Sequence, residues 1–88
     1  MFHKVKQVNP IENYVLEIIF QDNTTKYYDV SMLFEKWPIF QEMINIKGLF
    51  EQVKVDKGGY GISWNDEIDL SCNELWENGY TKVNEGEK

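Results

Sequence analysis

The chain has 88 residues, of which 42% are hydrophobic and 15% aromatic, enough for one hydrophobic core and therefore one domain. Its formal net charge is −6, its nine basic residues are all lysine and it has one cysteine, which disfavours nucleic-acid binding, disulfide frameworks and multi-cysteine zinc sites. No apolar stretch approaches the roughly 20 residues that span a bilayer and the N-terminus lacks a signal-peptide core, so we expect a cytoplasmic protein with no membrane segment.

The first third of the chain predicts three strands of an antiparallel sheet. Residues 2–10 mix valine with lysine and glutamine and stop at Asn-Pro, as a half-exposed strand does before a turn. Residues 14–20 (YVLEIIF) predict the clearest strand, because apolar side chains alternate onto one face. An Asp-Asn turn leads to the return strand, residues 26–30, so these two strands form a hairpin. The predicted buried face of the middle strand consists of Leu16, Ile18 and Phe20.

The middle of the chain predicts two short helices. Apolar residues recur there at three- and four-residue spacings, which is the pattern of a helix face. Pro38 divides the stretch, because proline interrupts a helix interior and fits best in the first turn of the next helix. Lys47-Gly48 ends the second helix. The apolar residues of the pattern are Met32, Leu33, Phe34, Trp37, Ile39, Phe40, Met43 and Ile44.

The last part of the chain predicts three short strands, at residues 52–56, 62–64 and 68–70, followed by a helix. The sequence KGGYG between the first two strands predicts a glycine-rich hairpin turn. The order of elements is therefore βββ-αα-βββ-α. We expect a single small α+β domain over residues 1–80, built from antiparallel β-hairpins with short helices packed on one face of the sheet. A polar tail, residues 81–88, follows the domain.

The start and the end of the final helix are both marked in the sequence. Ser71 and Glu74 match a capping box, in which each side chain accepts a hydrogen bond from a free N–H group of the first turn. Leu70 and Leu75 flank the box as a hydrophobic staple. Gly79 stands where a left-handed C-terminal cap is expected.

The stretch from Asn65 to Glu74 is rich in oxygen ligands and raises the question of a metal site. A calcium-binding loop needs glycine at its sixth position and glutamate at its twelfth. When Glu74 takes the twelfth position, the sixth is Ile68. We therefore predict no metal site and interpret Asn65, Asp66 and Glu67 as a tight polar turn.

No catalytic constellation is predicted. Cys72 begins the final helix, whose dipole can lower the pKa of a thiol, but the only histidine, His3, belongs to a different strand. The KGGYG turn lacks the Lys-Ser/Thr pair and the helix that follow in a phosphate-binding loop. We therefore expect no catalytic residue, no cofactor and no enzyme activity.

Aromatic and acidic residues supply a candidate interaction surface. Tyr27 and Tyr28 are adjacent in a strand and so point to opposite sides, which leaves one ring facing outward. Residues 45–88 carry nine acidic residues against five lysines, which favours a basic partner. The residues that we assign to this surface are Tyr27, Tyr60, Trp64, Asp66, Glu67 and Asp69.

Two ordered stretches, VKQVNPIENYVLEIIFQDNTTKYYDVSMLF and LFEQVKVDKGGYGISWNDEIDLSCNELWENG, resemble the small bacterial domain-of-unknown-function family 2442. The resemblance runs from about Val5 to Gly79. It implies a compact bacterial α+β domain without an established activity, often encoded beside another small protein, which suggests a toxin–antitoxin pair. Some relatives carry a C-terminal helix-turn-helix. Only nine residues follow Gly79 here, too few for such a module.

Three hypotheses for the function follow. The first is a non-catalytic protein-interaction module, the acidic antitoxin-like member of a two-protein system, whose binding to a basic protein is sensitive to salt. The second is a ligand-sensing or regulatory domain related to the N-terminal part of helix-turn-helix regulators, which holds a small molecule between sheet and helices in an apolar pocket with convergent polar groups. The three tryptophans could line such a pocket, but packing in the core and at its rim is the favoured interpretation for them. The third, an enzyme, is the least supported, and self-association through strand edges is a further alternative.

Overall fold

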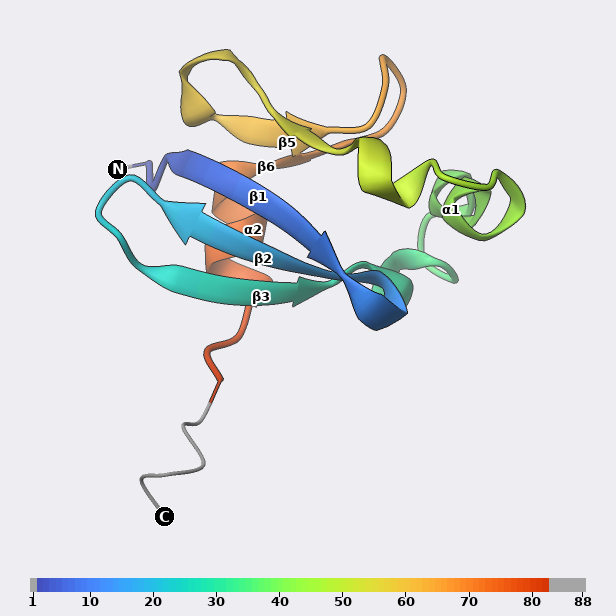
Figure 1. Ribbon diagram of the computed structural model, residues 1–88, viewed down its shortest axis with the longest axis horizontal. Helices are drawn as coiled ribbons and strands as arrows, with labels where there is room; N and C mark the ends of the chain where they lie inside the picture. Colours follow the sequence, from blue (N-terminus) through green and yellow to red (C-terminus); the bar gives the residue numbers. More distant parts are fainter. Residues whose placement is uncertain (1, 83–88) are drawn as a thin grey trace.

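The described residues form two three-stranded antiparallel sheets, the helix α2 and a series of shorter helical turns (Figure 1). The computed structural model describes residues 2–82, so that residues 83–88 of the predicted polar tail lie outside the described part. The helix, α2, lies behind the first sheet, and the second sheet lies along the β1 side of the first (Figure 1). This arrangement confirms the predicted α+β class and the antiparallel hairpins.

The first sheet has the strand order β1-β2-β3. As predicted, the alternating apolar residues of β2 face the core, because Leu16, Ile18 and Phe20 are completely buried. The turn before β3 is held by Asp22, whose Oδ1 accepts a hydrogen bond of 2.9 Å from the backbone N–H of Thr24. The strands are β1 (Val5–Ile11), β2 (Val15–Phe20) and β3 (Thr25–Asp29).

The second sheet has the order β4-β5-β6, with β4 (Lys54–Val55), β5 (Gly61–Ser63) and β6 (Asp69–Ser71). The predicted glycine turn joins β4 to β5 as a short 3₁₀ turn, η5 (Lys57–Gly59). Gly59 has a φ of 83°, and a Cβ atom there would lie 2.5 Å from the carbonyl oxygen of Val5 in β1. Glycine is therefore required where the second sheet meets the first.

The two helices predicted in the middle of the chain are mostly 3₁₀ turns. Pro38 does divide the segment, and it occupies the first turn of η3 as expected. Because the residue before a proline is pushed into an extended conformation, Trp37 has φ −131° and ψ 99° and breaks the helical spacing. The four elements of the segment are η2 (Val30–Leu33), η3 (Pro38–Gln41), α1 (Glu42–Asn45) and η4 (Phe50–Gln52).

Helix α2 (Cys72–Asn78) begins as predicted, since the Ser71 hydroxyl oxygen accepts a hydrogen bond of 3.1 Å from the backbone N–H of Glu74. The reciprocal half of the capping box is absent from the described structure. The Glu74 carboxylate instead accepts a hydrogen bond of 2.7 Å from the hydroxyl group of Tyr28. The Glu74 side chain therefore links the helix to β3 and leaves the cap to Ser71.

The end of α2 corrects a second expectation. Gly79 is not left-handed, because its φ and ψ are −75° and 160°. Tyr80 then pairs with the outer edge of β3, where its N–H and C=O groups each form a hydrogen bond of 2.7 Å with Tyr27. A Cβ atom at Gly79 would lie 2.5 Å from the Leu75 carbonyl oxygen. The glycine therefore serves a close turn of the chain back to the sheet, which local helix-capping patterns do not reveal.

The hydrophobic core fills the space between the two sheets and α2. Its largest completely buried side chains include Tyr28, Phe20 and Ile62, and Leu75 of α2 is also completely buried. No helix in the described residues is long and apolar enough to cross a membrane.

Candidate functional site

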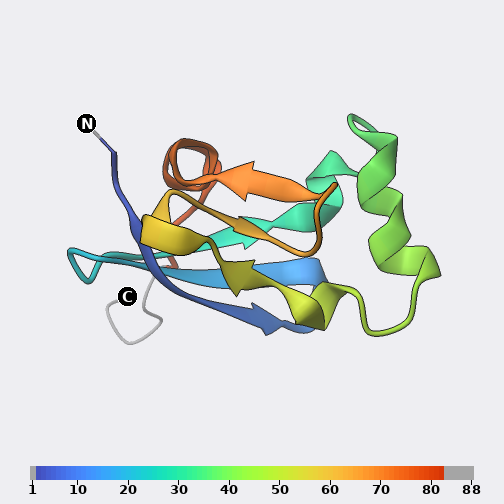
Figure 2. The same ribbon diagram turned by 90° about the horizontal axis from the view of Figure 1, so that it is seen from above.

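Large apolar side chains are exposed at one end of the molecule. Residues 32–46 contribute five of the eight large hydrophobic side chains that are exposed in the described structure. We call these five residues the apolar turn segment: Met32, Trp37, Ile39, Ile44 and Ile46, with exposed fractions of 36 to 55%. The turns and α1 that carry them project from the end of the sheets (Figure 2). Such side chains do not contribute fully to the core, so a contact with another molecule is a reasonable role for them.

The exposure follows from the local backbone. A regular helix would have brought the predicted apolar face together, but only Leu33, Phe40 and Met43 of that pattern are buried. The extended residue Trp37 and the 3₁₀ turns rotate the remaining members away from the core. The two predicted helices are therefore replaced by turns, and five apolar residues of this stretch form an exposed surface.

The acidic loop, Asn65 to Glu67, joins β5 to β6 at the same end of the molecule (Figure 2). The Asn65 Oδ1 atom accepts hydrogen bonds from the backbone N–H groups of Glu67, at 2.9 Å, and Ile68, at 3.0 Å. This closes the turn that the sequence predicted and leaves the side chains of Asp66 and Glu67 exposed. The loop therefore presents two carboxylates to solvent.

Trp64 is not a surface residue, contrary to its assignment to the candidate surface. Only 4% of it is exposed. Its indole Nε1–H donates a hydrogen bond of 3.1 Å to the Phe50 carbonyl oxygen, and its ring packs edge-to-face against Phe40. A tryptophan can bury its ring and still satisfy its N–H, as this one does directly after β5. Trp64 instead ties the start of the acidic loop to the turns that carry the apolar turn segment.

The other predicted surface residues lie on separate faces. Tyr27 is on the outer face of β3, half-buried, where its ring lies beside Tyr80 and under the Lys82 ammonium group. Tyr60 follows the glycine turn and packs edge-to-face against Phe2. Asp69 is exposed on β6. The structure thus brings Asp66 and Glu67 together but does not gather all six predicted residues into one site.

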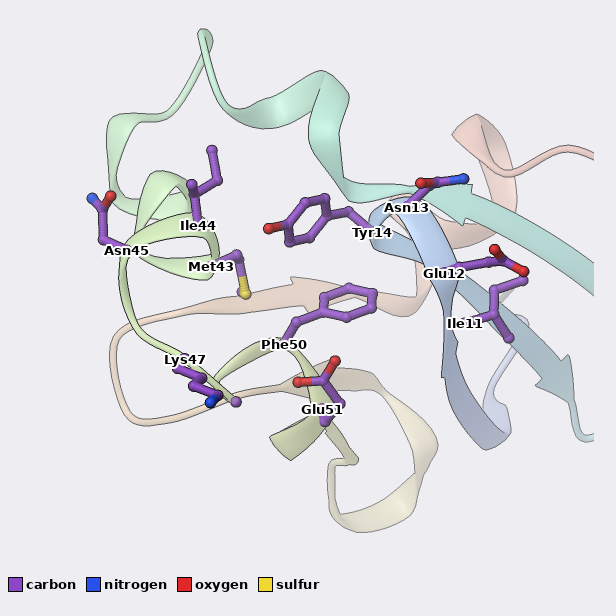
Figure 3. A pocket seen from close by; sticks show the side chains of 11 residues that line it. Ile11, Glu12, Asn13, Tyr14, Met43, Ile44, Asn45, Lys47, Phe50 and Glu51 are labelled. Atoms are coloured by element: carbon purple, nitrogen blue, oxygen red, sulfur yellow. The ribbon is translucent and has the colours of Figure 1, made fainter.

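A groove of about 500 Å³ lies between the β1–β2 turn and the segment from α1 to η4 (Figure 3). Tyr14 points into it from the β1–β2 turn, and Met43 and Phe50 lie beside the ring (Figure 3). The Glu51 carboxylate lies at the rim between Lys47 and Phe50 (Figure 3). The full lining consists of Ile11, Glu12, Asn13, Tyr14, Met43, Ile44, Asn45, Lys47, Gly48, Phe50 and Glu51.

The sequence analysis missed this groove. It placed Tyr14 at the start of a strand, whereas Asn13 and Tyr14 both adopt left-handed backbone conformations, with φ values of 63° and 62°. The asparagine just before the strand was the available signal, because asparagine tolerates this conformation. Tyrosine adopts it rarely, and packing holds it there: the Tyr14 ring lies edge-to-face against Phe34, at 5.3 Å, and Phe50, at 5.4 Å.

The two residues considered for nucleophilic chemistry, Cys72 and His3, both pack against other parts of the domain. Cys72 is buried. The His3 ring stacks on Trp76 of α2, with ring centroids 3.6 Å apart, and the Lys26 ammonium group lies over the same indole, 4.2 Å from its ring centroid. Within residues 2–82, no group of three or more His, Cys, Asp or Glu side chains is arranged to hold a metal ion.

Three pKa values are shifted by the fold. Burial, followed by the hydrogen bond to Glu74, raises the pKa of Tyr28 far above its usual value. Burial and the nearby Glu17 raise the pKa of Tyr27 as well. Hydrogen bonds from Thr24 lower the pKa of the exposed Asp22 carboxyl group. Tyr28 lies in the core, Tyr27 on the outer face of β3 and Asp22 in a turn. None of the three groups lines the groove.

Comparison with known proteins identifies a family but no function. The model of a protein family described as being of unknown function, DUF2442, matches residues 5–81. Neither the curated proteins nor the solved structures contain a match to the chain. The arguments for function therefore come from the surface of the chain itself.

Proposed function

Because the chain belongs to the DUF2442 family, which is described only as being of unknown function, we propose a function from its surface chemistry: a non-catalytic protein-interaction module. On this proposal the module binds a basic partner protein and is the acidic, antitoxin-like member of a two-protein system. The observation that carries the proposal is the apolar turn segment. Five large apolar side chains exposed in one stretch of a small domain are well suited to a protein interface.

Charge favours a basic partner. The chain has a net charge of −6, and the acidic loop adds the exposed carboxylates of Asp66 and Glu67 at the end that carries the apolar turn segment. The border is not purely acidic, because the Lys36 ammonium group lies over the Trp37 ring, 4.8 Å from its centroid. An apolar surface with nearby acidic side chains gains affinity from burial and gains specificity and association rate from electrostatics. The partner is therefore expected to offer an apolar patch bordered by lysine or arginine.

The test is a capture experiment with matched variants. The tagged protein and three variants, Ile44→Ser, Glu67→Gln and Glu77→Gln, are incubated with lysate of the source cells, and retained proteins are identified by mass spectrometry. Glu67→Gln and Glu77→Gln remove the same exposed charge, but Glu77 belongs to α2 and not to the acidic loop. A specific basic partner is expected to be retained by the unchanged protein and by Glu77→Gln, and to be reduced for the other two.

Salt provides a second measurement in the same experiment. The screening length falls from about 30 Å at 0.01 M salt to about 3 Å at 1 M, so retention is expected to decrease as salt rises. Retention that survives both Ile44→Ser and Glu67→Gln and does not respond to salt would contradict the proposed surface.

The groove supports a second candidate, the ligand-sensing or regulatory domain. Its volume of about 500 Å³ lies within the range of small-molecule sites, and polar and apolar side chains both line it. The chain purified from its source is expected to retain a small molecule if this function is correct. Native mass spectrometry before and after denaturation would reveal such a molecule, and an identical mass in both states would count against this alternative.

A further inference from the structure

From the groove beside the apolar turn segment, we propose that the chain receives an arginine side chain of its basic partner there, with Tyr14 and Glu51 as the two recognising residues. This inference rests on the proposed interaction function and specifies which chemical group the partner inserts. The groove and the apolar turn segment are continuous, because Ile44 belongs to both.

The shape of the groove suits a single long side chain. One wall is the β1–β2 turn with Tyr14, and the opposite wall is α1 with Met43 and Ile44 (Figure 3). Met43 and Phe50 are almost completely buried, so that they form an apolar base, whereas Tyr14 is only half-buried. An aliphatic stem can pack against these apolar atoms while its polar end reaches the rim.

The Tyr14 ring is a fixed surface against which a planar cation can stack. Its contacts with Phe34 and Phe50, at interplanar angles of 79° and 73°, hold the ring in place. A ring that is already immobilised loses little further conformational freedom when a ligand binds. Guanidinium groups stack on aromatic rings more often than ammonium groups do, which favours arginine over lysine.

The charges at the rim select a cation. Glu12 and Glu51 contribute two carboxylates to the lining and Lys47 contributes one ammonium group, so the groove has an excess of one negative charge. The Glu51 carboxylate lies at the rim beside Phe50 (Figure 3). The groove lining thus contains both groups that a guanidinium group binds, a carboxylate for the charged hydrogen bond and the Tyr14 ring for the stacking contact.

The experiment is an NMR titration of the ¹⁵N-labelled chain with three capped tripeptides: acetyl-Gly-Arg-Gly-amide, its citrulline analogue and its lysine analogue. Citrulline has nearly the shape of arginine and no charge, so it is the matched control. We expect the arginine peptide to shift the amide signals of Asn13, Tyr14, Gly48 and Glu51 in a saturable manner. The dissociation constant is expected to be on the order of 1 mM, because so small a contact yields only about 4 kcal/mol.

Variants locate the recognition. Glu51→Gln is expected to weaken binding of the arginine peptide about tenfold, since the carboxylate charge is lost and only a weaker hydrogen bond to a neutral amide oxygen can form. Glu51 is exposed, so this substitution does not threaten the fold. Glu67→Gln, which changes the acidic loop and not the groove, is expected to leave the affinity unchanged. Equal affinity for the citrulline or the lysine peptide, or the absence of saturable shifts at the groove, would overturn the inference.

The outcomes separate this inference from the interaction function. If partner capture depends on Ile44 and Glu67 but the arginine peptide does not bind at the groove, the interaction function is supported and the arginine site is rejected. If the arginine peptide binds at the groove but no variant changes partner capture, the arginine site is supported and the proposed interface is rejected.

Discussion

The half of the molecule built from the first sheet and α2 differs from the turn-rich segment of residues 30–52 in how it uses apolar residues. In β2, three alternating apolar side chains are completely buried, whereas in the turn-rich segment apolar residues of similar size are divided between core and surface. The backbone explains the difference, because a strand places every second residue on one face and a series of 3₁₀ turns interrupted by an extended residue does not. The regular half therefore supplies stability and the irregular segment supplies surface.

The largest expected effect compares one isoleucine from each region. Ile18→Ala is expected to lower the free energy of unfolding by about 2–5 kcal/mol, because it leaves a cavity in a core position without exposed area. Ile44→Ala removes the same atoms from a side chain that is 55% exposed and is expected to cost no more than about 0.5 kcal/mol. Urea denaturation of both variants measures the difference. Similar losses would show that the turn segment contributes to the core as much as β2 does.

The next effect concerns the link between β3 and α2 in the regular half. Tyr28→Phe removes the hydroxyl group that donates to the Glu74 carboxylate and is expected to cost about 1.5–3 kcal/mol. The neighbouring Tyr27→Phe is the control, since the Tyr27 hydroxyl makes only a long contact of 3.4 Å with Glu17. We expect that control to cost less than about 0.5 kcal/mol. Equal losses in thermal or urea unfolding would contradict the assignment.

The same hydroxyl predicts a response to alkaline pH. The pKa of Tyr28 is raised in the folded chain, while in the unfolded chain it is near its usual value of about 10. Above pH 10 the unfolded chain loses this proton and the folded chain keeps it, so stability falls as pH rises. The unchanged chain is expected to lose up to about 1.4 kcal/mol per pH unit more than Tyr28→Phe does. Identical slopes for the two proteins in unfolding measurements would show that this phenol titrates normally when folded.

A smaller effect is expected at the start of α2. Ser71→Ala removes the oxygen that accepts from the Glu74 N–H and is expected to cost about 1 kcal/mol. Ser71→Asn is the matched variant, because asparagine also caps helices, and it should restore most of the loss. If Ser71→Ala had the same melting temperature as the unchanged protein, the cap would not contribute to stability.

The smallest effect on stability is expected in the apolar turn segment. Trp37→Ser replaces a side chain that is 40% exposed and should change the free energy of unfolding by no more than about 0.5 kcal/mol. Because Trp64 is buried and Trp76 is half-buried, the tryptophan emission of the folded protein should shift to shorter wavelength once Trp37 is absent. A loss above about 1 kcal/mol would place Trp37 among the core residues.

Local patterns in the sequence predicted the regular half well. The two-residue period of β2, the turn at Asp22 and the cap at Ser71 each depend on neighbours along the chain, and each is confirmed. Gly79 and Glu74 were predicted incorrectly because their conformation and partner depend on β3, about fifty residues earlier in the chain. Local rules for helix ends contain no information about such contacts.

The candidate sites were harder to predict for the same reason. Trp64 was assigned to the surface, and only its contacts with Phe40 and Phe50, which are distant in the sequence, reveal that it is buried. The groove requires Tyr14 and Glu51, which come from turns that are far apart in the sequence and share no sequence pattern. The turn at Asn65 was predicted correctly because its hydrogen bonds close within three residues.

The stacking of His3 on Trp76 has a consequence for the order in which the domain folds. The stack joins the start of the described chain to the last helix, so it closes a loop that contains most of the domain. Contacts between residues that are far apart in the sequence cost more loop-closure entropy than local contacts do. The His3–Trp76 stack is therefore expected to form late and to mark the completion of the fold.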